Sequence, residues 1–166
     1  MSNFRLVLID IQRDFYHPEG SYGRAGRPLE PIQQTISHLK NVVDPKTPVI
    51  RVQSVYKPGQ FEDMPHLCKD PDDGGRWHPD LTMGDLLTKE DHSGFPALKR
   101  YFTSKVPLIL AGVCTHRCVQ ATLRDLVENG WNVSVYRHGV SSCGLRHEQH
   151  EQCLRKWDRR GLLLSQ

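Results

Sequence analysis

The sequence predicts an α/β fold of three layers, with helices on both faces of an open, mostly parallel sheet. Short apolar runs that suit buried strands alternate along the chain with segments whose apolar residues recur at helical spacing. The strand-like runs are apolar at successive positions, as in strands that are covered on both faces. Chains with this alternation form strand–helix–strand units and a parallel sheet.

Length and composition narrow the class of protein. At 166 residues, the chain has the size of one domain, and we expect a single domain over 1–166. A mean hydropathy of -0.55, with 37% hydrophobic and 25% charged residues, is typical of a soluble globular protein. The net charge of +3 comes from Lys and Arg residues scattered among acids, which disfavours a nucleic-acid partner.

Targeting signals and cysteine spacing indicate the compartment. No stretch has the features of a signal peptide or of a membrane span, so we expect a cytoplasmic protein without a membrane partner. The five cysteines are odd in number and widely spaced, which predicts free thiols and no disulfide framework.

The first half of the chain predicts one strand–helix–strand unit followed by a long irregular segment. The first strand is expected over 4–9 and ends at Asp10. A helix over 29–43 and a second strand over 48–52 complete the unit. Residues 57–79 are rich in Pro, Gly and Asp, and irregular segments of this length in compact domains are often functional.

The second half repeats the alternation. The expected elements are a weak strand near 85–87, a short helix opening around 93–96, a strand over 106–111, a helix capped by Thr115 and closed at 129–130, a strand over 131–136, a polar helix over 146–157 and an edge strand over 162–164. In open parallel sheets the reacting groups gather beyond the carboxyl ends of the strands.

Two reactive groups follow predicted strands. Asp10 comes after the first strand, and Cys118 lies in the first turn of the helix that follows the strand over 106–111. The helix N-terminus is expected to lower the pKa of the Cys118 thiol, an advantage that Cys114 lacks. On the residues alone, alternatives remain, because such a cysteine is commonly a small buried apolar residue and Asp10 is equally suited to cap a turn.

Three segments carry motifs in a fixed order. Residues 10–15 read Asp-Ile-Gln-Arg-Asp-Phe, residues 89–95 read Lys-Glu-Asp-His-Ser-Gly-Phe, and residues 112–122 read Gly-Val-Cys-Thr-His-Arg-Cys-Val-Gln-Ala-Thr. They resemble the Asp-x-Gln-x-Asp-Phe, Lys-x-x-x-Ser-Ala/Gly-Phe and Gly-Val-x-Thr-x-x-Cys-Val-x-x-Thr motifs of the isochorismatase-like hydrolases, which include nicotinamidases and N-carbamoylsarcosine amidase. The resemblance covers nearly the whole chain, apart from 57–80 and the C-terminus, and implies the Rossmann-like α/β fold of that family.

The resemblance also implies the roles of individual residues. Cys118 is expected to be the nucleophile, Asp10 the group that transfers its proton, and Lys89 the cation that stabilises both anions. A cis peptide bond between Val113 and Cys114 is implied as well. The backbone N–H groups of Cys114 and Cys118 are expected to form an oxyanion hole.

A cysteine at position 118 bears on the bond that is cleaved. True isochorismatases, which cleave a vinyl ether, carry a non-nucleophilic residue at this place. The resemblance therefore implies a cysteine hydrolase that cleaves a C–N bond of a small amide through a covalent acyl-enzyme. Hydrolysis of an imino, ureido or vinyl ether group remains an alternative, as does an idle relative that serves as a binding or assembly module. Relatives form dimers or tetramers, so we expect a homo-oligomer.

The surroundings of the site can be predicted less fully. Its walls are expected to include Phe15, Tyr22, Trp77 and His92, with ordinary packing as the alternative for each. We expect no metal and no cofactor. Nicotinamidases of the family hold a metal with an Asp-x-His motif after the second strand, whereas residues 51–58 here read Arg-Val-Gln-Ser-Val-Tyr-Lys-Pro.

Overall fold

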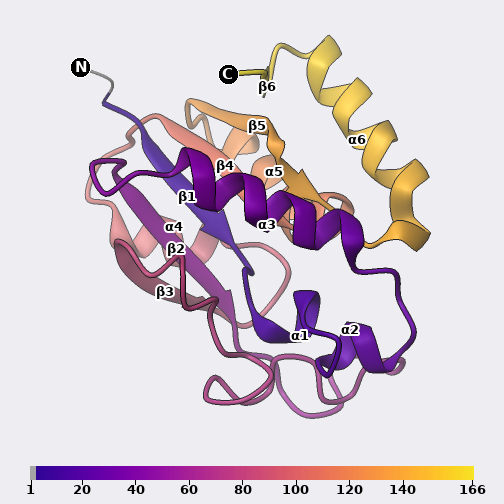
Figure 1. The fold of residues 1–166 in the computed structure, drawn as a ribbon. Coiled ribbons are helices and arrows are strands. Elements are labelled where there is room, and N and C mark those ends of the chain that lie inside the picture. Colours follow the sequence, from indigo (N-terminus) through magenta and orange to yellow (C-terminus); the bar gives the residue numbers. More distant parts are fainter. Residues whose placement is uncertain (1–2) are drawn as a thin grey trace.

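A single six-stranded sheet forms the centre of the molecule (Figure 1). We describe residues 3–166 in a computed structural model of the chain. The strand order is β3-β2-β1-β4-β5-β6, and every neighbouring pair is parallel. The strands are β1 (Arg5–Ile9), β2 (Val49–Ser54), β3 (Asp85–Lys89), β4 (Leu108–Val113), β5 (Val133–Ser141) and β6 (Leu163–Leu164). The predicted α/β fold class is confirmed.

Helices cover both faces of the sheet. The helix α3 (Glu30–Val42) lies on one face, and α4 (Phe95–Tyr101), α5 (Gln120–Glu128) and α6 (His147–Arg159) contribute to the apolar core on the other. In Figure 1, α3 crosses in front of the sheet and α4 and α5 lie behind it. None of the helices within residues 3–166 is long and apolar enough to cross a membrane.

The apolar run of β1 reflects burial on both faces. Leu8 packs in the cluster that contains Leu39 of α3, whereas its neighbour Ile9 packs in the cluster that contains Leu126 of α5. All four side chains are fully buried. Successive residues of a strand point to opposite faces, so a strand between two helical layers must be apolar throughout.

The glycine-rich stretch after β1 holds two short helices that the sequence did not predict. They are α1 (Arg13–Tyr16) and α2 (Ser21–Arg24). The buried Asp14 carboxylate accepts hydrogen bonds from the backbone N–H of Ser21 at 2.8 Å and of Cys68 at 2.7 Å. The contact with Cys68 joins segments far apart in sequence, so local periodicity does not reveal it.

Gln12 fixes the long irregular segment between β2 and β3. Its side-chain amide donates to the backbone carbonyls of Ser54 and Gly75, both at 2.8 Å, and its Oε1 accepts the Ser54 N–H at 2.9 Å. The segment, which was predicted to be irregular, therefore folds back over the carboxyl ends of the strands, beside α1 and α2 (Figure 1). Gln12 and Asp14 of the first motif thus hold the loops that surround the strand ends.

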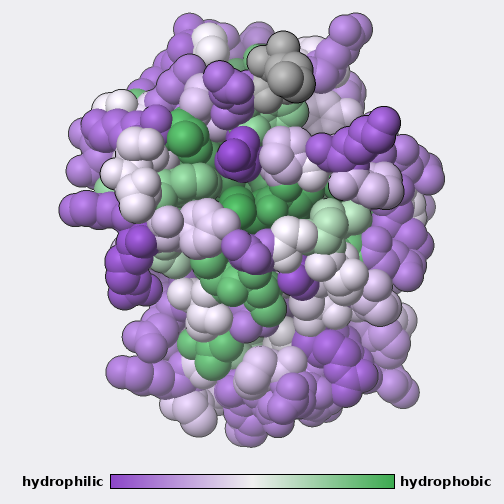
Figure 2. Space-filling view, turned by 90° about the vertical axis from the view of Figure 1, so that its left-hand side faces the viewer, coloured by the Kyte–Doolittle hydropathy of each residue, from purple (hydrophilic) through white to green (hydrophobic). Residues whose placement is uncertain are grey.

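A few large apolar side chains remain exposed. They are Val42, Leu86, Tyr101 and Leu145. Figure 2 shows hydrophobic residues in the middle of one face of the molecule, bordered by hydrophilic ones. Leu86 belongs to β3, an edge strand of the sheet. The expected assembly of this chain into a homo-oligomer stays a prediction.

Gly112 is required where β4 passes β1. Its φ is +122°, and a Cβ there would lie 2.1 Å from the backbone oxygen of Ile9. We expect Gly112→Ala to lower the free energy of unfolding by about 2 kcal/mol or more, because the methyl group adds a clash to the backbone strain. Urea unfolding measures this loss.

Gly161→Ala is the matched control, since Gly161 also has a positive φ but open space around the Cβ position. It is expected to cost only the backbone strain, about 1 kcal/mol. Equal losses in the two variants would contradict the close approach of β4 to β1.

Candidate active site

Three strand ends bring Asp10, Lys89 and Cys118 together. Asp10 follows β1, Lys89 is the last residue of β3, and Cys118 lies in the helical turn after β4. The Lys89 Nζ is 3.2 Å from Asp10 Oδ2 and 3.4 Å from Cys118 Sγ. Asp10 has no exposed surface, and Lys89 and Cys118 are each 4% exposed. A sulfur, a carboxylate and an ammonium group therefore share one buried site.

Ser54 and Tyr56 complete this cluster, and the sequence analysis missed both. The Ser54 hydroxyl donates to Asp10 Oδ1 at 2.8 Å and accepts from Lys89 Nζ at 2.6 Å. The Tyr56 hydroxyl accepts from Lys89 Nζ at 3.2 Å and lies 3.5 Å from Cys118 Sγ. The sequence does contain a signal for both, because they are polar residues at alternate positions where β2 ends.

The helix that carries Cys118 begins differently from the prediction. Its first turn is a π-helix, η1 (Thr115–Val119), in which the N–H of Val119 donates to the carbonyl of Cys114 at 3.2 Å. The predicted Thr115 cap is wrong, because Thr115 Oγ1 lies 2.8 Å from His150 Nδ1 and no side chain caps the turn. Tertiary packing against α6 thus takes the hydroxyl that the sequence pattern assigned to a cap.

Thr122 fixes the turn of Cys118 to the segment after Lys89. Its hydroxyl donates to the Cys118 carbonyl and accepts the N–H of Gly94, at 2.7 and 2.8 Å. Thr122 is fully buried. Thr122 therefore links the second and third sequence motifs, in addition to the contact between Lys89 and Cys118.

The surroundings of Cys118 keep its thiol protonated. Burial raises the pKa of Cys118, the Asp10 carboxylate raises it further, and the Lys89 ammonium opposes both. The predicted lowering of this pKa by the helix N-terminus is therefore wrong. Burial acts to lower the pKa of Lys89, but its contacts with Asp10 and Cys118 outweigh burial and raise that pKa. The resting site holds a neutral thiol beside an ammonium group.

A pocket of about 460 Å³, open mouth included, leads to Cys118. Phe15, Tyr22 and His92, three of the four expected wall residues, line it. His92 Nδ1 lies 3.7 Å from Cys118 Sγ. Burial and then the charge of Lys89 lower the pKa of His92, so its imidazole is neutral near neutral pH.

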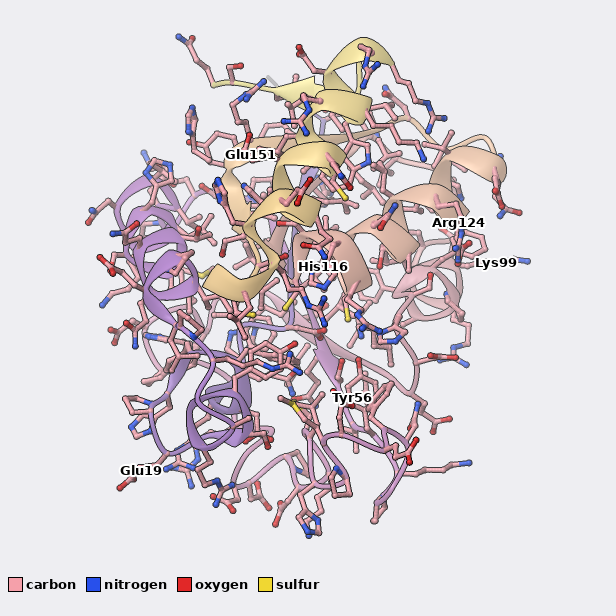
Figure 3. The ribbon with its side chains drawn as sticks, turned by 90° about the vertical axis from the view of Figure 1, so that its right-hand side faces the viewer. Glu19, Tyr56, Lys99, His116, Arg124 and Glu151 are labelled. Carbon is pink, nitrogen blue, oxygen red and sulfur yellow. The ribbon has the colours of Figure 1, made fainter. Side chains whose placement is uncertain are left out.

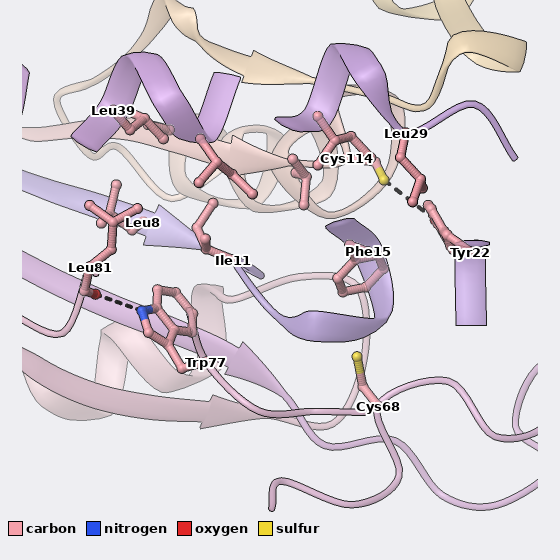
Figure 4. Close-up of a cluster of buried hydrophobic side chains, with 14 of the residues drawn as sticks. Leu8, Ile11, Phe15, Tyr22, Leu29, Leu39, Cys68, Trp77, Leu81 and Cys114 are labelled. Carbon is pink, nitrogen blue, oxygen red and sulfur yellow. Dashed lines mark hydrogen bonds between the residues drawn. The ribbon is translucent and has the colours of Figure 1, made fainter. Parts of the chain in front are cut away.

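Trp77, the fourth expected wall residue, does not line the pocket. It is buried in the core, and its indole N–H donates to the Leu81 carbonyl at 2.6 Å. Figure 4 shows the indole directed to Leu81, on the other side of Ile11 from Tyr22. A β-bridge to Gln12 holds the backbone of Trp77 beside the end of β1, and its side chain packs in the core cluster with Ile11 instead of at the pocket.

Other wall residues escaped the sequence analysis. They are Arg27, Tyr56, Phe61, Asp63, Met64, Leu67 and Arg117. The spacing of Phe61, Met64 and Leu67, three residues apart, is the signal that marks one apolar side of the irregular segment. This part of the chain, where the resemblance is weakest, therefore contributes to the wall over the thiol.

The peptide bond between Val113 and Cys114 is cis, as the resemblance implies.

The thiol of Cys114 is also protonated. Burial raises its pKa to about 12, although a hydrogen bond with Tyr22 opposes this. The two side chains approach to 3.4 Å between Tyr22 Oη and Cys114 Sγ. All five cysteines are free thiols.

The side chains at the strand ends do not fit the metal site of nicotinamidases. Where that Asp-x-His motif would stand after β2, Ser54 and Tyr56 are already bonded to Asp10 and Lys89. Within residues 3–166, no three His, Cys, Asp or Glu side chains are grouped as metal ligands. The absence of a metal stays a prediction.

The isochorismatase domain family model matches residues 5–162. The chain belongs to the isochorismatase family of hydrolases. A comparison with curated protein sequences gives no significant match.

Solved structures share the fold of this family member. An isochorismatase-like hydrolase from Alkaliphilus metalliredigens has a TM-score of 0.76 at 20% identity, covering 95% of this chain and 92% of its own. A pyrazinamidase of Pyrococcus horikoshii in complex with zinc has 0.71 at 22%, covering 98% of both chains. The nicotinamidase of Staphylococcus aureus has 0.64 at 18%, covering 100% of both. At these identities the likeness establishes the fold alone.

The pKa of Cys118 predicts how the isochorismatase-family site reacts with alkylating agents. At about pH 7, iodoacetamide should modify Cys118 slowly, because little thiolate is present, and the rate should keep rising beyond about pH 9. Asp10→Asn should shift the rise to lower pH, since the carboxylate is one cause of the raised pKa. Mass spectrometry of the labelled peptide measures the rate. If the labelling rate of the unmodified protein stopped rising below about pH 8, the raised pKa of Cys118 would be contradicted.

The buried ion pair between Lys89 and Asp10 predicts that loss of the lysine alone destabilises the protein. Lys89→Ala leaves the Asp10 carboxylate buried without its cation and should lower the free energy of unfolding by about 3–5 kcal/mol. Urea unfolding measures the loss. The double variant Asp10→Asn with Lys89→Met should recover part of it, because neither charge then remains buried.

Lys99→Ala is the control for this experiment. Lys99 is an exposed lysine on α4, and Figure 3 shows it at the edge of the molecule, away from Tyr56. We expect a change within about 0.5 kcal/mol. A Lys89→Ala loss no larger than this would show that the pair does not stabilise the fold.

Proposed function

We propose that this member of the isochorismatase family is a cysteine hydrolase that cleaves the C–N bond of a small amide. The observation that carries the proposal is the contact of the Cys118 sulfur with the Lys89 ammonium at 3.4 Å, with Asp10 paired to the same ammonium at 3.2 Å. A nucleophile that lines a pocket, backed by a buried base and a buried cation, is what nucleophilic acyl transfer requires. Structures with the same fold include enzymes named for amide substrates, a nicotinamidase and a pyrazinamidase.

The first step moves the thiol proton to Asp10. Asp10 Oδ2 is buried and accepts no hydrogen bond, although it is paired with Lys89, so it is free to take the proton. Because the pKa of Cys118 is raised, the proton leaves as the sulfur attacks the carbonyl carbon. Lys89 stabilises the carboxylate before the transfer and the sulfur during it.

The second step releases the amine. The backbone N–H groups of Cys114 and Cys118 stabilise the oxyanion of the tetrahedral intermediate. The protonated Asp10 returns its proton to the nitrogen as the C–N bond breaks, which leaves a thioester on Cys118. A water molecule then attacks the thioester while Asp10 takes one of its protons. The C–S bond breaks, the carboxylic acid leaves, and Asp10 returns the proton to the sulfur, which restores the thiol.

Ammonia release from a panel of small primary amides and ureides tests the proposal. We expect Cys118→Ala to lower turnover more than about a hundredfold, by analogy with nucleophile deletions in other enzymes. Asp10→Asn should cause a similar loss, since it removes the proton acceptor. A thioester trapped on Cys118 and detected as a mass increase would support the covalent route.

Cys153→Ala is the matched control, because Cys153 is a buried thiol on α6 that does not line the pocket. Its turnover should equal that of the unmodified protein. Equal ammonia release by Cys118→Ala would end the proposal. A complete lack of turnover, with rapid binding of other partners, would favour the idle binding module.

A further inference from the structure

We infer that the substrate carries a carboxylate at the end opposite the amide, and that Arg117 and Arg27 bind this carboxylate at the pocket mouth. The inference rests on the proposed function. It adds the substrate class, an anionic monoamide, and two residues that determine specificity.

The charges along the pocket wall do not cancel. Two arginines and one aspartate, Arg27, Arg117 and Asp63, line it. Arg27 is paired with Asp63 at 3.2 Å, whereas Arg117 makes no ion pair with any residue in the described part of the chain. Beneath them, Asp10 and Lys89 form a pair of opposite charges. One guanidinium charge is therefore left for a ligand.

Arg27 is held in place by more than its ion pair. Its guanidinium lies over the ring of Tyr22, 4.5 Å from the ring centroid, and Tyr22 in turn contacts Cys114. The side chain is 20% exposed. A guanidinium that is fixed by an aromatic face loses little freedom when it binds an anion, and its planar fork matches a carboxylate.

Arg117 is the residue directly before the nucleophile, and its field reaches the pocket. Burial, then the charge of Lys89 and then that of Arg117 lower the pKa of His92, whose ring lies beside the Cys118 sulfur. Burial followed by the charges of Arg117, Arg146 and Arg27 lowers the pKa of His116 to about 4. Burial is the larger cause at both imidazoles, and the positive charges around the pocket act in the same direction. Such charges favour an anionic ligand and repel a cationic one.

Four apolar side chains line the same pocket as the thiol and the arginines. They are Phe15, Phe61, Met64 and Leu67. This surface suits a short hydrocarbon chain between the two polar ends of the substrate. It also excludes water, which strengthens a pair between a guanidinium and a carboxylate.

Matched amides test the inference. Succinic and glutaric monoamides each carry one carboxylate, and butanamide and pentanamide replace that carboxylate by a methyl group. We expect kcat/KM for ammonia release to be at least about tenfold higher for the acid monoamides, because a charged hydrogen-bonding group is recognised at the mouth. Raising the salt concentration should reduce this preference.

Substitutions of the two arginines test where the substrate carboxylate binds. Arg117→Gln should raise KM for the acid monoamides about tenfold and leave kcat and the neutral amides nearly unchanged, because only ground-state binding of the carboxylate is lost. Arg27→Gln should act in the same direction. Arg124→Gln is the control, since Arg124 is an exposed arginine on α5 that Figure 3 shows apart from Tyr56.

Binding to the Cys118→Ala variant separates this inference from the proposed function. Calorimetry on that variant requires no turnover, and we expect glutaric monoamide to bind more tightly than pentanamide and to lose that advantage in Arg117→Gln. Equal binding of the two ligands overturns the inference, even if Cys118 proves to be the nucleophile. Preferential binding without any ammonia release would overturn the proposed chemistry and retain the anion site.

Discussion

The buried Lys89 ammonium is the group on which the rest of the site depends. It is the only cation that contacts both the Asp10 carboxylate and the Cys118 sulfur among the described ion pairs and hydrogen bonds. Without it, the Asp10 carboxylate, which has no exposed surface, would be buried without a cation in a medium of low dielectric constant. Ser54 and Tyr56 bind the same ammonium, so the site is arranged around this lysine.

Sheet topology explains why these residues can meet. The order β3-β2-β1-β4 places four parallel carboxyl ends side by side, and each contributes a residue of the cluster. The distances between these residues are then fixed by side chains that have no role in the proposed proton transfer. Gln12 joins the end of β1 to the end of β2, and Thr122 joins the turn of Cys118 to the segment after Lys89.

The irregular segment between β2 and β3 forms part of the pocket wall. It is anchored by Asp14 and Gln12, residues of the first motif, and it contributes apolar side chains and Asp63 to the wall. Asp63 pairs with Arg27 across the mouth. The chemistry of the site therefore comes from the strand ends, whereas the charge and shape that a substrate meets come largely from loops.

The sequence by itself determined the fold class, the order of the strands along the chain and the identity of the family, because periodicity and short motifs are local properties. It also placed Asp10 and Cys118 after strands. Only the tertiary structure decided that Trp77 points into the core, that the Thr115 hydroxyl bonds to α6, and that the pKa of the Cys118 thiol is raised. Each of these depends on burial and on partners distant in sequence. A motif predicts which residues are present at a site, but their protonation and orientation follow from the surroundings that the folded chain provides.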